Sequence, residues 1–191
     1  MALDSESRWR LVRMMKAKGQ QSDSTGEIVL RSATADDLLA MVEIYNYYIQ
    51  NSVVTFDMEN MALEDWSAKF NWIKDLGLPF IVAQSPSGQI IGFAYVAPWR
   101  QKAAFKRTVE DSIYLRPAAI GKRVGTKLLG ELLEQAKAAG VKEVVAVISD
   151  KGAESSIALH ERFGFKHQGH LGKVGFKFGR WLGTVLMQKS L

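Results

Sequence analysis

The chain reads Thr108-Val-Glu-Asp-Ser-Ile-Tyr-Leu-Arg-Pro117 and then Ala118-Ala-Ile-Gly-Lys-Arg-Val-Gly-Thr126 at its most informative point. A β-prone run that ends at a proline leads through a loop with two glycines into a segment with helical periodicity. The first backbone N–H groups of a helix have no partner within the helix, and the helix dipole favours an anion there. The sequence therefore predicts a strand, a loop and a helix that together bind a phosphate.

Glu110 lies on the predicted strand, just upstream of this phosphate site. A carboxylate in such a place suggests the transfer of a group from a phosphate-bearing cofactor, with the carboxylate as the base. Asp111 points to the opposite face of the strand, because side chains alternate along it, and is the weaker candidate. The alternative for Glu110 is a solvated strand carboxylate without a catalytic role.

The composition indicates one globular domain that works in a reducing compartment. The 191 residues are 47% hydrophobic and 24% charged, which is ordinary for a single domain with a good core. No apolar run approaches the roughly 18 residues of a membrane helix, and none near Met1 resembles a secretory signal, so we expect no membrane partner. The absence of cysteine excludes disulfides, thiolate metal sites and a thiol nucleophile, and it fits a cytoplasmic protein.

The charge distribution favours a small anionic ligand over nucleic acid. The formal net charge is +5, without the clustered cations and stacking aromatics of a nucleic-acid groove. Residues 1–26 hold five Lys or Arg and three acidic residues, and we interpret them as a basic N-terminal extension that ends in a linker. A loosely ordered tail and a membrane-surface or partner helix both fit this segment. The folded domain then covers residues 27–191.

The remaining pattern predicts an alternation of strands and helices. The order is β-α-α-β-β-β-α-β-α-β-β, which indicates an α/β or α+β sandwich with a mostly antiparallel front and a βαβ unit behind it. Thr34 and Asp37 form a capping-box pattern before the first helix. Strands are expected at residues 28–30, 80–83, 89–96, 108–115, 143–148, 166–172 and 181–188. Further helices are expected at 63–76, from 124 to a stop at Gly140, and at 155–163.

Several short motifs carry a resemblance to a known family. They are Ile44-Tyr-Asn46, Thr108-Val-Glu-Asp-Ser-Ile-Tyr114, Gly121-Lys-Arg-Val-Gly125, Ser156-Ile-Ala-Leu-His-Glu161, Phe163-Gly-Phe165 and Val174-Gly-Phe-Lys-Phe-Gly-Arg-Trp-Leu182. With them, residues 27–191 resemble the GNAT superfamily of N-acetyltransferases, and within it the phosphinothricin or methionine sulfoximine acetyltransferases. The resemblance implies a mixed sheet of about seven strands, flanked by about four helices and splayed in the middle for acetyl-CoA. It also implies a homodimer.

The resemblance further implies which residues bind acetyl-CoA. The backbone of Ile113, Tyr114 and Leu115 would pair with the pantetheine arm as an added strand does, and would polarise the thioester carbonyl. The pyrophosphate would lie against Gly121, Lys122, Arg123, Val124, Gly125 and Thr126. Ser156 matches a family serine, whereas Ala153 stands where family members often have an asparagine that contacts the cofactor.

The glycine loop departs from the family pattern at two positions. Family members usually have Arg or Gln where this chain has Ile120, and glycine where it has Arg123. A left-handed backbone at Arg123 would cost a non-glycine residue roughly 1 kcal/mol. Its guanidinium could instead fold over the phosphates as a bidentate donor. We expect acetyl-CoA binding to survive both changes.

The implied reaction moves an acetyl group to an amine, which must lose a proton before it attacks. In the resembling family a glutamate at the position of Glu110 accepts this proton, directly or through one water. His160 stands where many superfamily members have a tyrosine that protonates the leaving thiolate, so it is a candidate acid or proton relay. A histidine packed at a helix end and hydrogen-bonded to the backbone fits the sequence equally well. His167 and His170 lack the partners of a metal site, and we predict no metal.

The acceptor is expected to meet the loop Trp99-Arg-Gln-Lys-Ala-Ala-Phe-Lys-Arg107. Its four cations suit a carboxylate or phosphinate on the substrate. The expected contacts are, from the residues, Phe56, Trp99 and Arg100 and, from the resemblance, Ala103, Ala104 and Phe105. A solvated basic loop and ordinary core aromatics are the alternatives.

Together these observations predict an acetyl-CoA-dependent N-acetyltransferase. The expected acceptor is the amine of a small amino acid or analogue, and the resemblance implies phosphinothricin, methionine sulfoximine and methionine sulfone. Transfer is expected to be direct, within a ternary complex, because no cysteine can carry an acyl-enzyme. Two alternatives stay open. One is a polyamine or a peptide N-terminus as the acceptor, and the other is a non-catalytic acyl-CoA-binding module.

Overall fold

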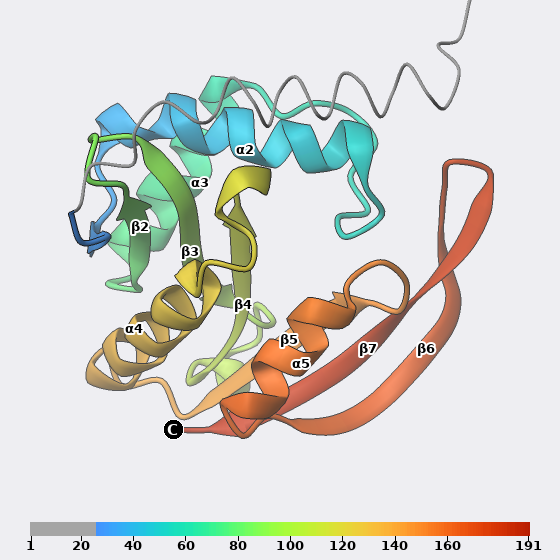
Figure 1. Ribbon diagram of the computed structural model, residues 1–191. Coiled ribbons are helices and arrows are strands. Elements are labelled where there is room, and N and C mark those ends of the chain that lie inside the picture. Colours follow the sequence, from blue (N-terminus) through green and yellow to red (C-terminus); the bar gives the residue numbers. More distant parts are fainter. Residues whose placement is uncertain (1–25) are drawn as a thin grey trace, which may run out of the picture.

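The strand predicted at residues 108–115 is β4 (Thr108–Leu115), and it lies in the middle of a seven-stranded sheet (Figure 1). The computed structural model describes residues 26–191, so all of the predicted extension except Gly26 lies outside the described residues. The order of strands across the sheet is β1-β2-β3-β4-β5-β7-β6. The other strands are β1 (Val29–Ser32), β2 (Phe80–Gln84), β3 (Ile90–Pro98), β5 (Glu143–Ser149), β6 (Lys166–Lys177) and β7 (Arg180–Ser190).

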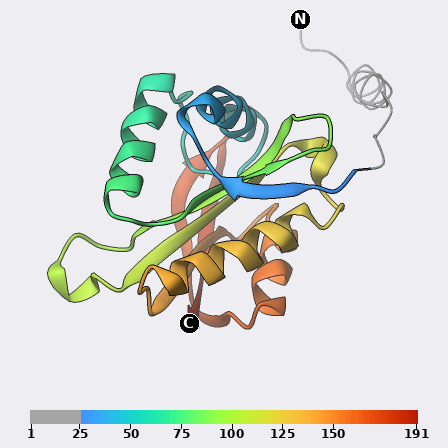
Figure 2. The same cartoon turned by 90° about the vertical axis from the view of Figure 1, so that its left-hand side faces the viewer.

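Helices cover both faces of this sheet, as Figure 2 shows from the side. One face carries α2 (Leu38–Asn51) and α3 (Leu63–Asp75), and the other carries α4 (Val124–Ala138) and α5 (Glu154–Arg162). Three short 3-10 helices lie between the longer elements: η1 (Ala35–Asp37), η2 (Ala103–Phe105) and η3 (Pro117–Ala119). The predicted α/β class, with a mixed sheet and flanking helices, is confirmed. Within residues 26–191, no helix combines the length and the apolar character that crossing a membrane requires.

Each face of the sheet has its own hydrophobic core. On the α4 side, apolar residues recur every three or four positions along the helix, and Leu128 and Leu132 are fully buried against the strands. On the α2 and α3 side the core is aromatic, and Trp66 is buried with its ring edge-on to Tyr45 and Phe93, at centroid distances of 5.3 and 5.4 Å. The two cores fix β4 between them, with alternate side chains directed to opposite faces.

The sheet changes character at β4. Strands β1 to β4 are antiparallel neighbours, whereas β4 and β5 run parallel, as the predicted βαβ unit requires. Their pairing covers only three residues on each strand, from Thr108 to Glu110 on β4. Beyond Glu110 the two strands separate, although β4 continues to Leu115 and β5 to Ser149. The splay expected from the resemblance is therefore present, and its closed end lies at Glu110.

The last two strands are longer than the sequence predicted. The sequence predicts one strand that ends at Gly172 and another that begins at Trp181. Instead, the ladder continues past Gly172 through a register shift between Leu171 and Gly175. Lys173 has a φ of 56° in this bulge, and the hairpin turns at Phe178 and Gly179, with φ values of 50° and 73°. The result is a long β6–β7 hairpin that extends beyond the rest of the sheet (Figure 1).

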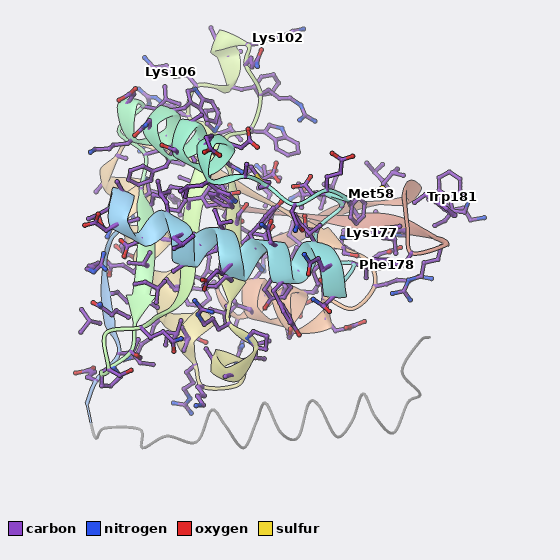
Figure 3. All side chains as sticks on the ribbon, turned by 90° about the horizontal axis from the view of Figure 1, so that it is seen from above. Met58, Lys102, Lys106, Lys177, Phe178 and Trp181 are labelled. Atoms are coloured by element: carbon purple, nitrogen blue, oxygen red, sulfur yellow. The ribbon has the colours of Figure 1, made fainter. Side chains whose placement is uncertain are left out.

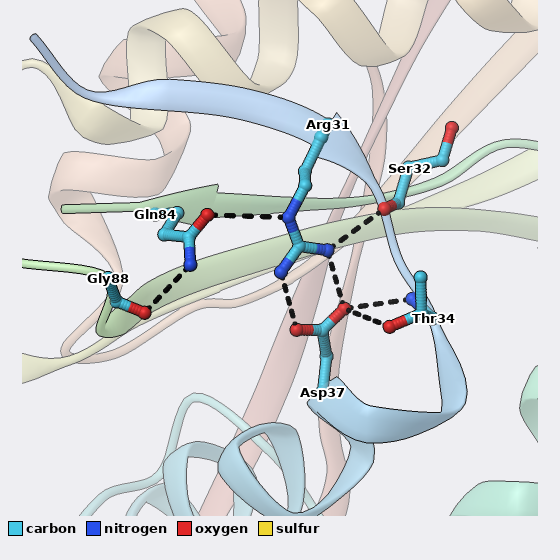
Figure 4. A network of polar contacts seen from close by, with 6 residues as sticks. All are labelled: Arg31, Ser32, Thr34, Asp37, Gln84 and Gly88. Carbon is cyan, nitrogen blue, oxygen red and sulfur yellow. Dashed lines mark hydrogen bonds and ion pairs between the residues drawn. The ribbon is translucent and has the colours of Figure 1, made fainter. Parts of the chain in front are cut away.

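The start of α2 is held by a buried carboxylate (Figure 4). Asp37 accepts hydrogen bonds from the Thr34 backbone N–H at 2.8 Å and from two guanidinium nitrogens of Arg31 at 2.7 and 2.8 Å. Arg31 is in β1, and its Nε also donates to Gln84 of β2 at 3.4 Å. Burial alone would raise the pKa of Asp37, but the guanidinium and the Thr34 N–H hold it below its ordinary value. The predicted capping box is confirmed, and it ties α2 to the sheet edge.

We predict that Asp37→Ala lowers the free energy of unfolding by about 2–3 kcal/mol at pH 7, because it removes a helix cap and leaves Arg31 without its partner. Equilibrium denaturation checks this value.

The lowered pKa of Asp37 makes its contribution to the free energy of unfolding depend on pH. The contribution is present above the unfolded pKa and is lost as the pH falls through the folded pKa. The loss on mutation should therefore shrink in acid. Asp36→Ala, an exposed neighbour, is the control and should change stability by less than about 0.5 kcal/mol; equal losses in both variants would contradict the prediction.

Candidate active site

The edge of β4 that faces the opening offers backbone groups to a ligand. Ile113, Tyr114 and Leu115 pair with β3 on their other side, opposite Ala94, Phe93 and Gly92. Among the described residues, β5 does not pair with β4 beyond Glu110. An extended amide-containing chain could therefore lie beside β4 as an added strand. This is the arrangement that the pantetheine arm of acetyl-CoA requires.

A helix N-terminus lies at the carboxyl end of β4. The chain leaves the strand through η3 and enters α4 at Val124, with Gly121 at a φ of 80° and Arg123 at a φ of 62°. Arg123 is thus a non-glycine residue in the left-handed region, a strain of roughly 1 kcal/mol. Lys122 and Arg123 are both exposed beside the unpaired N–H groups of the first helical turn. These residues fit a pyrophosphate, because helix dipole and side-chain charge favour an anion at the same place.

The N-terminus of α5 lies across the opening from α4. Its N-cap, Ala153, is buried and its methyl group offers no hydrogen bond. Ser156, half-buried in the first turn, directs its backbone carbonyl to His160. The site residues predicted on this helix are therefore adjacent to one another, although Ala153 can contribute only its backbone.

Glu110 marks the closed end of the opening and faces the α2 and α3 side. It stands opposite Ala97 of β3, while its neighbour Val109 packs into the core on the α4 side. Burial raises the pKa of Glu110 above its ordinary value, and the charge of Asp111 raises it further; Lys69 and Arg100 act in the opposite direction. A partly buried carboxylate with a raised pKa is suited to accept a proton from an amine.

His160 forms a buried pair with Asp111 on the other face of β4. The His160 Nε2 atom lies 2.9 Å from Asp111 Oδ2, and the two side chains are 4% and 2% exposed. The Nδ1 atom lies 2.7 Å from the Ser156 carbonyl, which can only accept, so Nδ1 carries a proton. Burial opposes the charged ring, but the Asp111 carboxylate and the Ser156 carbonyl outweigh it and raise the pKa of His160. Asp111 and His160 thus join β4 to α5 just beyond the last residue at which β4 pairs with β5.

The predicted acceptor loop projects from the end of β3 and β4. Ala103, Ala104 and Phe105 form the exposed 3-10 helix η2, and Lys102 and Lys106 extend into solvent on either side of it (Figure 3). Arg100 stacks on the half-buried Trp99, with its guanidinium carbon 4.1 Å from the ring centroid.

Phe56 lies apart from this loop, in the segment that connects α2 and α3. Its ring packs against Gly175 of β6, where a Cβ atom would come within 2.6 Å of the ring. Nearby, buried Lys177 of β6 donates to the Thr55 carbonyl at 2.9 Å. The structure therefore associates Phe56 with the β6–β7 hairpin and the other predicted contacts with the β3–β4 loop.

The family model for acetyltransferases of the GNAT type matches residues 41–165, which span the whole site. This chain belongs to the GNAT acetyltransferase family. The matched range includes the splayed strands β4 and β5 and the N-terminus of α4. The resemblance inferred from the short motifs is thus confirmed.

Similar proteins narrow the group within the GNAT family. The chain is 36% identical over 162 residues to phosphinothricin N-acetyltransferase from Alcaligenes faecalis, with 85% of this chain and 82% of that protein covered. It is 37% identical over 162 residues to L-methionine sulfoximine/L-methionine sulfone acetyltransferase from Pseudomonas aeruginosa, with coverages of 85% and 94%. A phosphinothricin acetyltransferase from Sinorhizobium meliloti, solved in complex with acetyl-CoA, superposes with a TM-score of 0.82 at 42% identity, covering 86% of this chain and 88% of that one.

Sequence reasoning missed two features of this GNAT site. The sequence makes Asp111 the weaker candidate for the base because its side chain points to the opposite face from Glu110, and the structure has it on that face; its pairing with His160 forms only when α5 packs on the sheet. Lys69, half-buried on α3, donates to the Tyr95 hydroxyl at 2.6 Å on the Glu110 side of the sheet. In the sequence Lys69 lies between Trp66 and Phe70, two residues of the buried stripe of α3, and such a lysine is common in ordinary helices.

We predict that Asp111→Asn lowers the pKa of His160, because the carboxylate that stabilises the charged ring is lost while burial remains. Imidazole NMR titration checks this, and the chain helps because it has only three histidines. His167 and His170 pair with Glu161 and Asp150 and serve as internal controls. An unchanged titration of His160 in the variant would show that Asp111 does not set its charge.

Proposed function

We propose that this protein is an acetyl-CoA-dependent N-acetyltransferase that acts on the amine of a small amino acid or analogue of the phosphinothricin, methionine sulfoximine or methionine sulfone type. The observation that carries the proposal is the place of Glu110 at the closed end of the splay between β4 and β5. There a base on one face of the sheet meets the opening that would hold the acetyl donor. Similar proteins that share most of the chain are named for these acceptors.

The proposed cofactor-binding residues follow the opening from its mouth to its closed end. We assign the pyrophosphate to residues 121–126 at the α4 N-terminus and the pantetheine arm to the β4 edge at residues 113–115. Ala153 and Ser156 of the α5 N-terminus are assigned to the opposite wall. Bound there, acetyl-CoA would supply an acetyl group activated as a thioester. The β4 backbone N–H groups would polarise its carbonyl.

Glu110 and His160 have different tasks in the proposed reaction. Glu110 accepts a proton from the acceptor ammonium, directly or through one water, and so produces the neutral amine that attacks. His160 is proposed as a proton relay on the α5 side of the opening rather than as a direct donor to the leaving thiolate, because Asp111 and the Ser156 carbonyl occupy its two ring nitrogens. Asp111 is the group that raises the pKa of its ring. Because the sequence has no cysteine to carry an acyl-enzyme, both substrates are bound together during transfer.

The acceptor is proposed to lie on the α2 and α3 side of Glu110. Trp99, Arg100 and residues 103–105 of the β3–β4 loop would form one wall, and Phe56 would contribute from the segment between α2 and α3. The charge of Arg100 also acts to lower the pKa of Glu110, so the guanidinium would lie near the reacting amine. A site with both a base and cations suits an amino acid, which carries an amine and an anion.

The test of this function is acetyl-CoA-dependent thiol release with a panel of free amino acids and analogues that includes methionine sulfone and phosphinothricin. The absence of cysteine from the chain means that a thiol reagent reports only the CoA released. Turnover with members of the panel supports the proposal. Binding of acetyl-CoA without turnover on the panel would favour a different acceptor or a binding module.

We predict that Glu110→Gln lowers kcat by about 10²-fold or more, as expected when a general base is lost, and leaves the acetyl-CoA dissociation constant within about threefold. In the unaltered protein, kcat/KM should fall as the pH drops through the raised pKa of Glu110, because only the carboxylate accepts a proton. This acid limb should disappear in the variant. Steady-state rates across pH and calorimetric binding of acetyl-CoA check both statements; an unchanged rate would remove Glu110 from the base role.

We also propose a homodimer and a cytoplasmic location. The location follows from the donor, since acetyl-CoA is an intracellular metabolite. The dimer is supported by five apolar side chains of the β6–β7 hairpin that are each more than half exposed: Leu171, Val174, Phe176, Phe178 and Trp181. Figure 3 shows Trp181 directed away from the rest of the molecule, whereas Phe178 lies beside Lys177, with its ring centroid 5.1 Å from the Lys177 Nζ atom.

Light scattering coupled to size-exclusion chromatography checks the oligomeric state. We predict a dimer for the unaltered chain and a monomer for the double variant Phe178→Asp, Trp181→Asp, because two charges would be buried unpaired in the interface. Leu39→Asp, at a residue of α2 that is 61% exposed, is the control and should leave the dimer intact. A monomeric unaltered chain would contradict the proposed assembly.

A further inference from the structure

Lys69 of α3 is a half-buried cation without an ion-pair partner among residues 26–191. Its Nζ donates to the Tyr95 hydroxyl at 2.6 Å and lies 4.6 Å from the Tyr95 ring centroid and 5.3 Å from that of Trp66. Aromatic faces and one phenol stabilise an ammonium only in part. A cation held away from bulk water gains most from an anion that arrives with the substrate.

The position of Lys69 relative to the base follows from the sheet register. Tyr95 of β3 stands opposite Ser112 of β4, and Ala97 stands opposite Glu110, so all four side chains belong to one face. Tyr95 therefore belongs to the next residue pair on the same face, two positions along the ladder from Glu110. Lys69 reaches down from α3 onto this phenol, and its charge acts on Glu110. The cation and the base thus border the same region from two different elements.

A base and a cation on the same face of the sheet suit the two ends of an α-amino acid. The amine and the carboxylate are attached to one carbon, so an amine directed at Glu110 places the carboxylate within a few ångströms of it. The carboxylate cannot face Glu110 itself without like-charge repulsion. Lys69 is a cation on that face that contacts with Tyr95 and Trp66 hold in place. Arg100 by contrast is exposed and stacks on Trp99 at the rim.

We propose that Lys69 binds the α-carboxylate of the acceptor and makes the site select α-amino acids over amines that lack a carboxylate. This inference rests on the proposed function and adds a specificity-determining residue to it. The Tyr95 hydroxyl holds the ammonium in place by accepting its hydrogen bond, and the Trp66 ring makes a cation–π contact with it. The basic β3–β4 loop is then left to contact the variable end of the acceptor.

The test compares two acceptors that differ only at the carboxyl group: methionine sulfone and its primary amide. Lys69→Gln removes the charge but keeps a hydrogen-bonding group near the Tyr95 hydroxyl, so folding is expected to be preserved. We expect kcat/KM for the free amino acid to fall by at least tenfold, mainly through KM. The value for the amide should change by less than threefold. Lys69→Arg should restore most of the preference for the free amino acid, because it restores the charge.

The control variant is Lys74→Gln on the same helix, which removes the same charge from an exposed side chain over Phe70. It should leave the ratio of the two kcat/KM values unchanged. Equal losses on both acceptors in Lys69→Gln, with a shift of the acid limb of the pH profile, would show that Lys69 acts only on Glu110 and would overturn the inference. An unchanged ratio in an active Lys69→Gln variant would overturn it as well.

The rates of the unaltered protein distinguish a failure of the role of Lys69 from a failure of the proposed acetyltransferase function. If the unaltered protein acetylates no member of the amino-acid panel, the proposed function fails and the role of Lys69 fails with it. If it acetylates the free amino acid and the variant keeps the same preference over the amide, only the role of Lys69 is wrong. Acetyl-CoA binding, measured by calorimetry in every variant, confirms that the opening between β4 and β5 is intact.

Discussion

The short pairing between β4 and β5 is the constraint on which the rest of the site depends. Parallel strands normally continue their ladder, and stopping it after Glu110 leaves backbone groups that must find other partners. Here β4 keeps β3 as a neighbour along its length, while β5 is held by β7 on its far side. The sheet can therefore open in the middle without losing its continuity. The opening provides both a surface that pairs with an amide chain and a closed end at which chemistry can take place.

At that closed end, two consecutive residues of one strand serve opposite faces. Glu110 faces the aromatic core under α2 and α3, where Lys69 and Arg100 supply positive charge. Asp111 faces α5, where His160 closes the gap left by β5. Side-chain alternation directs the two carboxylates to opposite faces of the sheet, so the partly buried Glu110 has a raised pKa while Asp111 pairs with the His160 ring. In the proposed reaction, this strand would keep the chemistry of the acceptor and the chemistry of the leaving group on opposite faces of the sheet.

The turn before α4 contains the strained backbone of Arg123. Arg123 adopts a left-handed backbone that glycine would adopt more easily, yet this conformation turns the chain so that α4 begins beside the end of β4. Arginine in place of glycine adds a guanidinium at the N-terminus of α4, the end of the helix that favours an anion. Local strain at a binding loop is tolerated because the buried face of α4, with Leu128 and Leu132, holds the helix in position.

The sequence by itself determined the elements and the family. Local signals sufficed for β4, for the capping box at Thr34 and Asp37 and for the amphipathic α4, because caps, glycines and hydrophobic periodicity act over a few residues. The motifs around Glu110 and Arg123 were enough to indicate a GNAT protein. The ends of β6 and β7 were missed, because a bulge lets a ladder continue past glycines that usually end it.

Only the tertiary structure decided which side chains meet. Asp111 and His160 are 49 residues apart, and Lys69 and Tyr95 are 26 apart. No local pattern marks either pair, since each forms only when a helix packs on the sheet at one rotation and register. The direction of the pKa shifts at Glu110 and His160 likewise depends on burial and on charges from other elements. Local motifs in the sequence therefore locate the site, whereas the packing of helices on the sheet decides which side chains are in contact and how their pKa values shift.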